Sequence, residues 1–145
     1  MALEMRINFT NILCKGTLKN YYLQGQIEGF VFQVRLSYYR GHFLSAIDKF
    51  GLKIDDEAIP QKDILFCLND KEFTVEELKN QSNEFWNILD PATIKVRKLG
   101  GLKPGNHKVT LELMLRCPYL PLPGSIREHH YAPINSCDEQ FMELC

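Results

Sequence analysis

The sequence of 145 residues has no long apolar run and no block of basic residues. No stretch approaches the roughly 20 consecutive apolar residues that a membrane-spanning helix needs. The formal net charge of -1 supplies none of the electrostatic footprint of a nucleic-acid binder. The N-terminal residues include Glu4 and Arg6 and lack the apolar core of a signal peptide. We therefore expect a cytoplasmic protein that binds neither membrane nor nucleic acid.

Residues that bind metals or form disulfides are few and unfavourably spaced. The five cysteines are odd in number and include no Cys-x-x-Cys pair, so neither a disulfide framework nor a zinc knuckle is indicated. The four histidines include no His-x-His pair of the kind that a cupin metal site uses. The adjacent His129 and His130 would point to opposite sides of an extended chain. We expect this chain alone to hold no metal and no other cofactor.

The sequence also lacks the short motifs of common enzyme classes. It has no phosphate-binding Gly-Lys-Ser/Thr loop, no Gly-x-Ser-x-Gly nucleophile elbow and no dinucleotide fingerprint. Its clustered carboxylates, at 55–57 and 76–77, stand beside a turn or at a helix start, where solvation or the helix dipole explains them. We expect no catalytic residue in this chain.

What the sequence does contain is alternation of apolar and polar residues, the pattern of β-strands with one buried face. This alternation covers residues 30–38, 50–55, 62–68, 92–97 and 109–116. The turn-rich residues 100–106 predict that the last two of these strands form an antiparallel hairpin with a long loop.

One short helix is expected, over residues 74–80, because Thr74 and Glu77 have the spacing of a capping box. The fold class is therefore all-β: an antiparallel β-sandwich, jelly-roll or immunoglobulin-like, with one short helix. The prolines of residues 119–124 predict that the chain leaves the sheet as an extended arm. The domain organisation is then a β-sandwich over 1–123 and a C-terminal extended tail over 124–145, either mobile or wrapped on another surface.

Two segments, 38–43 and 85–91, concentrate the residue types that are enriched at protein interfaces. The only tryptophan, Trp86, either plugs the end of the sandwich or contacts a partner. Tyr38 continues the inward parity of its strand and is expected in the core. The candidate partner interface consists of Tyr39, Arg40, His42, Phe43 and Trp86.

The same two segments, with others in the same order, resemble the small beta subunit of bacterial C-glycoside deglycosidases over residues 25–123. The Tyr-x-Arg-Gly-x-x-Leu-Ser segment of that family is matched by Tyr38, Arg40, Gly41, Leu44 and Ser45. Later segments of the family pattern are matched by Ile54-Asp55, by Glu77-Leu78, by Trp86, Asp90 and Ala92, by Gly100, Gly101, Leu102, Gly105 and His107, and by Arg116, Tyr119 and Pro121. Cys117-Pro118 and the residues after Pro123 depart from the pattern, so the family says nothing about the tail.

The resemblance implies a heteromeric lyase that cleaves the carbon–carbon bond between a 3-oxo sugar and an aromatic aglycone, as in flavonoid C-glucosides. The partner would be a large alpha subunit of the TIM-barrel type that holds a divalent metal, manganese, and the acid–base residues. This chain would be the accessory β-sandwich, without catalytic activity of its own. Two alternatives remain open: a carbohydrate-binding β-sandwich module and an independent enzyme such as an isomerase or cupin-like lyase.

Overall fold

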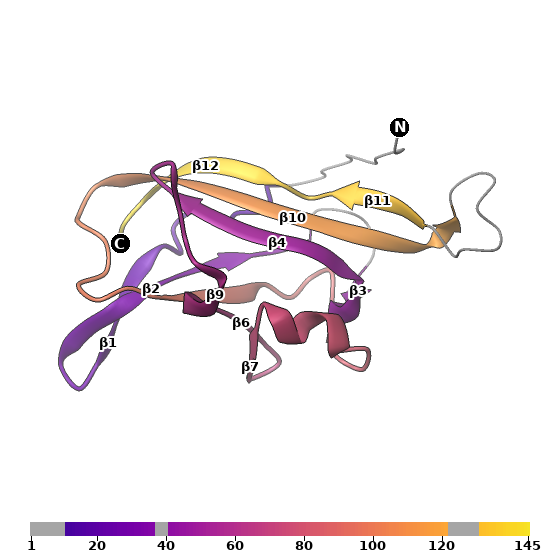
Figure 1. The fold of residues 1–145 in the computed structure, drawn as a ribbon. Helices are drawn as coiled ribbons and strands as arrows, with labels where there is room; N and C mark the ends of the chain where they lie inside the picture. Colours follow the sequence, from indigo (N-terminus) through magenta and orange to yellow (C-terminus); the bar gives the residue numbers. More distant parts are fainter. Residues whose placement is uncertain (1–10, 37–40, 122–130) are drawn as a thin grey trace.

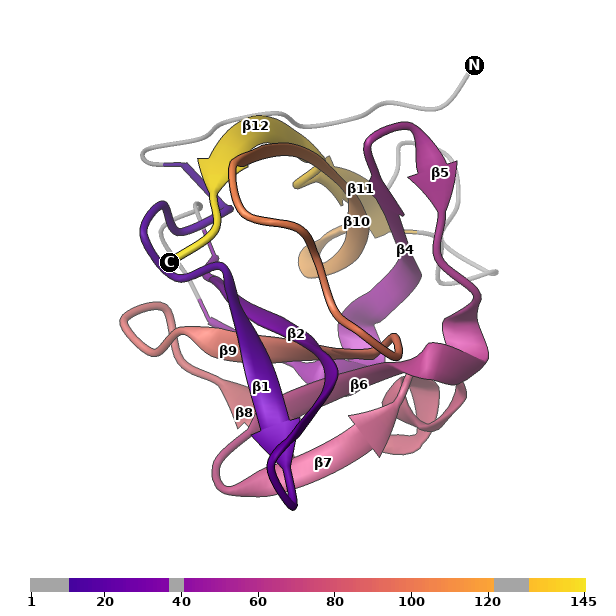
Figure 2. The ribbon, with the colours of Figure 1, turned by 90° about the vertical axis from the view of Figure 1, so that its left-hand side faces the viewer.

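A computed structural model describes residues 11–36, 41–121 and 131–145, which fold into two antiparallel sheets packed face to face (Figures 1 and 2). The first sheet has the strand order β1-β2-β9-β6-β7. It comprises β1 (Lys19–Leu23), β2 (Gln26–Val34), β9 (Ala92–Arg97), β6 (Ile64–Leu68) and β7 (Lys71–Thr74).

The second sheet has the order β11-β10-β4-β5, with β12 also paired to β10. It comprises β11 (Tyr131–Asn135), β10 (Asn106–Pro121), β4 (Ile47–Ile54), β5 (Glu57–Ala58) and β12 (Asp138–Glu143). A separate two-stranded ribbon joins β3 (His42–Phe43) to β8 (Phe85–Trp86). The prediction of an all-β antiparallel sandwich is confirmed.

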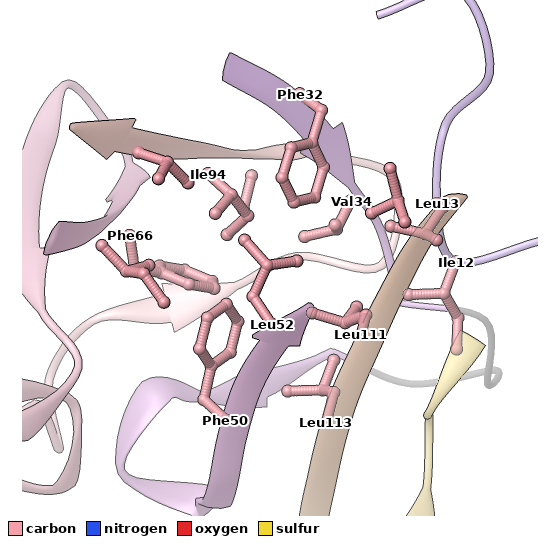
Figure 3. Close-up of a cluster of buried hydrophobic side chains, with 14 of the residues drawn as sticks. Ile12, Leu13, Phe32, Val34, Phe50, Leu52, Phe66, Ile94, Leu111 and Leu113 are labelled. Carbon is pink, nitrogen blue, oxygen red and sulfur yellow. The ribbon is translucent and has the colours of Figure 1, made fainter. Parts of the chain in front are cut away.

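The core between the sheets follows the alternation of the sequence. On β2, Phe30, Phe32 and Val34 are buried, and on β10 the alternating Val109, Leu111, Leu113 and Leu115 are buried. Figure 3 shows side chains from both sheets meeting in this layer. Phe50 of β4 and Phe66 of β6 touch edge to face across it, with ring centroids 6.0 Å apart. Burial of each such side chain stabilises the fold by about 1.5–3 kcal/mol.

The predicted helix is shorter and tighter than expected. Both capping-box bonds form: Thr74 N–H donates to Glu77 Oε1 (2.9 Å), and Glu77 N–H donates to Thr74 Oγ1 (3.2 Å). The residues that follow form a single 3-10 helix, η3 (Glu76–Asn80), rather than an α-helix of two or three turns. The described residues contain two further 3-10 turns, η1 (Leu44–Ala46) and η2 (Gln61–Asp63). None of their helices is long and apolar enough to cross a membrane.

The predicted hairpin between residues 92–97 and 109–116 is wrong. β9 lies between β2 and β6 in one sheet, whereas β10 pairs with β4, β11 and β12 in the other. The glycine-rich residues 98–105 therefore connect the two sheets. Alternation shows which face of a strand is buried, but it does not identify the neighbouring strand.

The predicted C-terminal arm also differs from the structure. β10 continues through Pro121, which pairs with Tyr131 after an irregular register. Residues 131–143 then return as β11 and β12 along the edge of β10. Proline is tolerated at an irregular strand position, where no ladder hydrogen bond is required of its nitrogen. Residues 131–145 are thus part of the sandwich rather than a tail.

Candidate functional site

The β3–β8 ribbon is a two-stranded sheet separate from the two main sheets, and β3 lies towards one end of the sandwich (Figure 1). We call it the aromatic ribbon (residues 42–43 and 85–86). His42 pairs with Trp86 and Phe43 pairs with Phe85. Neighbouring residues of a strand point to opposite faces, so the ribbon has one inner and one outer pair. The inner pair, His42 and Trp86, is buried, whereas Phe43 and Phe85 are 46% and 43% exposed.

Trp86 anchors the ribbon to the core. Its indole meets Phe66 edge to face, with ring centroids 5.2 Å apart and no exposed surface left. The indole Nε1–H donates a 2.8 Å hydrogen bond to the carbonyl of Asp90, which closes the turn that follows the strand. That satisfies the only polar atom of the side chain. Trp86 is therefore a plug at the end of the sandwich.

The outer face of the ribbon carries an exposed aromatic pair. The rings of Phe43 and Phe85 are 5.0 Å apart at an interplanar angle of 75°, the edge-to-face arrangement that aromatic pairs favour. The next turn presents Leu89, which is 85% exposed. Phe43 and Phe85 are thus exposed on a ribbon whose opposite face is buried, and Leu89 adds a third exposed apolar side chain after it.

Gly41, just before β3, is a position where only glycine fits. A Cβ atom there would lie 2.5 Å from the carbonyl oxygen of Trp86 and 2.6 Å from the ring of Phe85. Approaches under 3 Å force a neighbour to move, and one of these neighbours is backbone. The close approach of the chain to β8 therefore depends on a missing side chain.

Polar contacts surround the ribbon and hold its backbone in place. Leu44 N–H donates to the carbonyl of Glu84 at 2.9 Å, and Asn69 Nδ2 donates to the carbonyl of Phe85 at 3.4 Å. The Glu84 carboxylate pairs with Lys71, and hydrogen bonds from Lys71 and then Asn69 hold the pKa of Glu84 below its usual range. An apolar centre with a charged and amide rim is the usual anatomy of a protein–protein interface.

Arg116 extends this polar framework onto the second sheet. Its Nη2 donates to the carbonyl of Ser45 at 2.5 Å, and its Nε lies 3.5 Å from the Asp48 carboxylate. The guanidinium therefore ties β10 to η1, the turn that follows β3.

The structure separates the five residues predicted for the interface. Tyr39 and Arg40 lie outside the described residues. His42 and Trp86 are buried within this chain, which agrees with the reading of Trp86 as a plug, and a role of either residue in a partner interface stays a prediction. Phe43 is exposed. Phe85 is also exposed and was not among the predicted residues, although two bulky aromatics adjacent on a strand cannot both face the same core.

A second polar arrangement lies at the opposite end of the sandwich. His107, the second residue of β10, places Nδ1 2.7 Å from Asp55 Oδ2 and Nε2 2.6 Å from the carbonyl oxygen of Lys103. With both ring nitrogens engaged, the imidazole has no nitrogen to offer a substrate. This geometry is structural rather than that of an acid–base catalyst.

Other chemically active groups are scarce in the described part of the chain. No group of three or more His, Cys, Asp or Glu side chains there has the geometry to hold a metal ion. Cys67 faces the outer side of β6, and partial burial, followed by the charge of Glu72, raises the pKa of its thiol to about 11. A thiol with that pKa is almost wholly protonated near neutral pH and is a poor nucleophile.

Comparison with known proteins identifies a consistent set of relatives. The family model for the C-glycoside deglycosidase beta subunit matches residues 9–119. A C-glycoside deglycosidase beta subunit of Eubacterium cellulosolvens is 36% identical over 97 residues, which are 67% of this chain and 66% of that protein. The chain thus spans just under two thirds of that relative.

Two further relatives come from Microbacterium. A 3'-dehydrocarminate deglycosidase beta subunit of Microbacterium sp is 33% identical over 96 residues, 66% of this chain and 72% of that protein. A C-glycoside deglycosidase beta subunit of Microbacterium trichothecenolyticum is 31% identical over 109 residues, 75% of this chain and 79% of that protein. The region matched by the family model includes the aromatic ribbon and the His107–Asp55 pair.

Proposed function

Because the chain belongs to the C-glycoside deglycosidase beta subunit family, we propose that it is the small accessory subunit of a heteromeric C-glycoside deglycosidase. The observation that carries the proposal is the family match over residues 9–119, which takes in most of both sheets. The naming of the relatives as beta subunits implies a partner subunit. The sequence resemblance suggests that this partner is a TIM-barrel alpha subunit, and the N-terminal composition suggests that the complex is cytoplasmic.

The proposed reaction is a β-elimination on a C-glucoside whose sugar is oxidised at carbon 3. The ketone acidifies the proton on carbon 2, and a base removes that proton. The electron pair forms a double bond between carbons 1 and 2 while the bond from carbon 1 to the aglycone breaks, and the aglycone carbon takes up a proton. The substrate class, 3-oxo-C-glucosides of aromatic aglycones such as flavonoids, fits the name of the 3'-dehydrocarminate deglycosidase relative.

The proposal assigns the chemistry to the alpha subunit. A divalent metal bound there, manganese by the family resemblance, would polarise the oxygens next to the breaking bond. This chain would hold no metal and no catalytic residue of its own. Its role would be structural: to bind the alpha subunit and complete the active complex.

The aromatic ribbon is the surface that we propose for contact with the alpha subunit. Phe43 and Phe85 supply a rigid aromatic anchor, and Leu89 adds exposed apolar area beside the ribbon. Residues buried at the centre of an interface contribute most of its binding energy, and aromatic side chains are enriched among them. Tyr39 and Arg40 precede this surface in sequence. The planar fork of Arg40 suits a partner carboxylate or carbonyl.

The alternative, a carbohydrate-binding module, uses exposed aromatics differently. Sugar rings stack on flat aromatic platforms, whereas Phe43 and Phe85 stand at 75° to one another and share no common plane. This geometry favours contact with a protein surface.

The proposal is tested by expressing the chain with and without a candidate large subunit from the same genome. We expect a tagged form of this chain to retain the large subunit through gel filtration at one fixed stoichiometry. Metal analysis after dialysis should find the divalent ion with the large subunit and none in this chain alone. A chain that stays monomeric beside the large subunit, or that binds a C-glucoside by itself, would overturn the accessory role.

A further inference from the structure

His107 lies between two segments that are distant in sequence. Its Nδ1 lies 2.7 Å from Oδ2 of Asp55, in the turn between β4 and β5. Its Nε2 lies 2.6 Å from the carbonyl oxygen of Lys103, in the connection between the two sheets. The His107 side chain is only 12% exposed, whereas that of Asp55 is 53% exposed, so the ring is largely shielded from water and the carboxylate is not. One imidazole thus fastens the connecting loop to the end of the second sheet.

The two contacts together require two protons on the ring. A carbonyl oxygen and an ionised carboxylate are both acceptors, and a neutral imidazole has a single N–H to donate. Only the imidazolium form satisfies Asp55 and Lys103 at once. In the neutral form, one ring nitrogen would present its lone pair to an oxygen lone pair at less than 3 Å.

Asp55 is fixed as an ionised acceptor by more than His107. Its Oδ1 accepts a 2.9 Å hydrogen bond from the backbone N–H of Lys108. The hydrogen bond from His107, followed by that from Lys108, holds the pKa of Asp55 below its usual range. Partial burial lowers the pKa of His107, but its hydrogen bonds to Lys103 and Asp55 outweigh burial and hold that pKa above 6.5.

The other charged groups near the ring belong to four segments. Lys98, from the connecting loop, opposes protonation of His107. Asp56, beside Asp55, pairs with Lys108 of β10 at 3.0 Å, and Glu139 of β12 lies 3.7 Å from the same ammonium group. Lys108 is therefore neutralised by two carboxylates, which leaves Asp55 as the charged partner of the imidazole.

We infer that His107 is a pH-sensitive latch that fastens Lys103, in the connecting loop, to the β4–β5 turn when protonated and releases it when neutral. Release should occur at Lys103 rather than at Asp55. The single N–H of a neutral ring forms the stronger bond with a charged acceptor, and Asp55 is charged whereas the Lys103 carbonyl is not.

The first half of the loop has its own attachment and should not move with the latch. The side chain of Asn20 accepts from Leu102 N–H at 2.8 Å and donates to the Leu102 carbonyl at 3.0 Å. Gly100 N–H also donates to the carbonyl of Ile27. These contacts contain no titrating group. Leu102 therefore provides an internal control, one residue from Lys103.

The test is an NMR titration of the isotopically labelled full chain between about pH 5 and 9, a range that spans the ordinary histidine pKa. The His107 ring should carry protons on both nitrogens at the acid end and titrate with a midpoint above 6.5. The amide signals of Lys103 and Gly105 should shift with the same midpoint, while that of Leu102 stays constant. His107→Gln should abolish the shifts at Lys103 and Gly105.

Asp55→Asn should lower the His107 midpoint, and Asp56→Asn is the matched control in the same turn and should lower it less. If Asp55→Asn fails to fold, the protonation state and titration midpoint of the His107 ring in the unmodified chain still test the latch. A His107 ring that is neutral with a midpoint at or below 6.5 would overturn the latch. So would Lys103 and Gly105 signals that do not respond while His107 titrates.

Discussion

Phe43 and Phe85 stand directly opposite one another on β3 and β8, their rings 5.0 Å apart, and both remain more than two fifths exposed. The residues paired next to them, His42 and Trp86, are buried. The ribbon therefore has one buried face and one exposed face. Side chains restricted by contact with each other lose less conformational entropy on association, which favours this pair as a binding surface.

The exposed pair yields the first prediction. Phe43→Ala and Phe85→Ala should each weaken binding of the alpha subunit by about 2 kcal/mol or more, the range of interface hot spots. Titration calorimetry measures the binding, and thermal melting of this chain should show little change. Phe141→Ala is the matched control, because Phe141 is 69% exposed on β12, away from the ribbon. Equal affinity in the Phe43, Phe85 and Phe141 variants would place the interface elsewhere.

Gly41 gives a prediction about stability. Gly41→Ala would place a methyl group 2.5 Å from the Trp86 carbonyl, so β3 and β8 must separate. We expect a loss of about 1–3 kcal/mol in the free energy of unfolding, as for other overpacked sites. Gly51→Ala in β4 is the control, since its nearest neighbour would lie at 3.5 Å, an ordinary contact. A Gly41 variant as stable as the Gly51 variant in urea unfolding would show that the close approach is not required.

Trp86 should behave as a core residue rather than a contact residue. Trp86→Ala would remove a fully buried indole and its bond to Asp90, and should cost about 3–5 kcal/mol of unfolding free energy. As the only tryptophan, it also reports on the fold, with blue-shifted fluorescence that moves to the red on unfolding. A stable Trp86→Ala variant that fails only in partner binding would contradict this assignment.

His107 and Asp55 predict how stability depends on pH. The pKa of His107 is raised, so its contribution is complete below the unfolded value of about 6.5 and is lost as pH rises through the folded value. The pKa of Asp55 is lowered, so its contribution is complete above about 3.8 and is lost as pH falls through the folded value.

The unfolding free energy of the unmodified chain should therefore exceed that of His107→Gln most between about pH 4 and 6.5. The difference should shrink towards pH 9. Urea unfolding at several pH values measures this difference in unfolding free energy. A difference that grows above neutral pH would contradict the prediction.

The sequence was sufficient to predict the buried face of each main strand. Phe50, Leu52 and Ile54 are buried as their alternation indicated, and so are Ile64, Phe66 and Leu68. Period-two patterning reports burial directly because side chains of a strand alternate between faces. The sequence also predicted the capping box at Thr74 correctly, but it did not predict the length of the helix that follows.

Pairing and surface position were harder to predict. β9 and β10 look like a hairpin in sequence, yet each already has neighbours in a different sheet. The ribbon strands have two residues each, too short for a periodic signal, so the sequence left Trp86 undecided between a plug and a partner contact and did not indicate the burial of His42. The His107–Asp55 contact joins residues 52 positions apart and depends on the β4–β10 register. No local pattern encodes such a contact.

The most direct test of the accessory-subunit account measures release of the aglycone from a 3-oxo-C-glucoside. Chromatography monitors this release in three preparations. These are this chain alone, the large subunit alone, and the two purified as a complex, each supplied with manganese. The account predicts rapid release by the complex and none by this chain. Release by this chain alone would contradict the account, as would a large subunit whose rate and stability are unchanged when this chain is added.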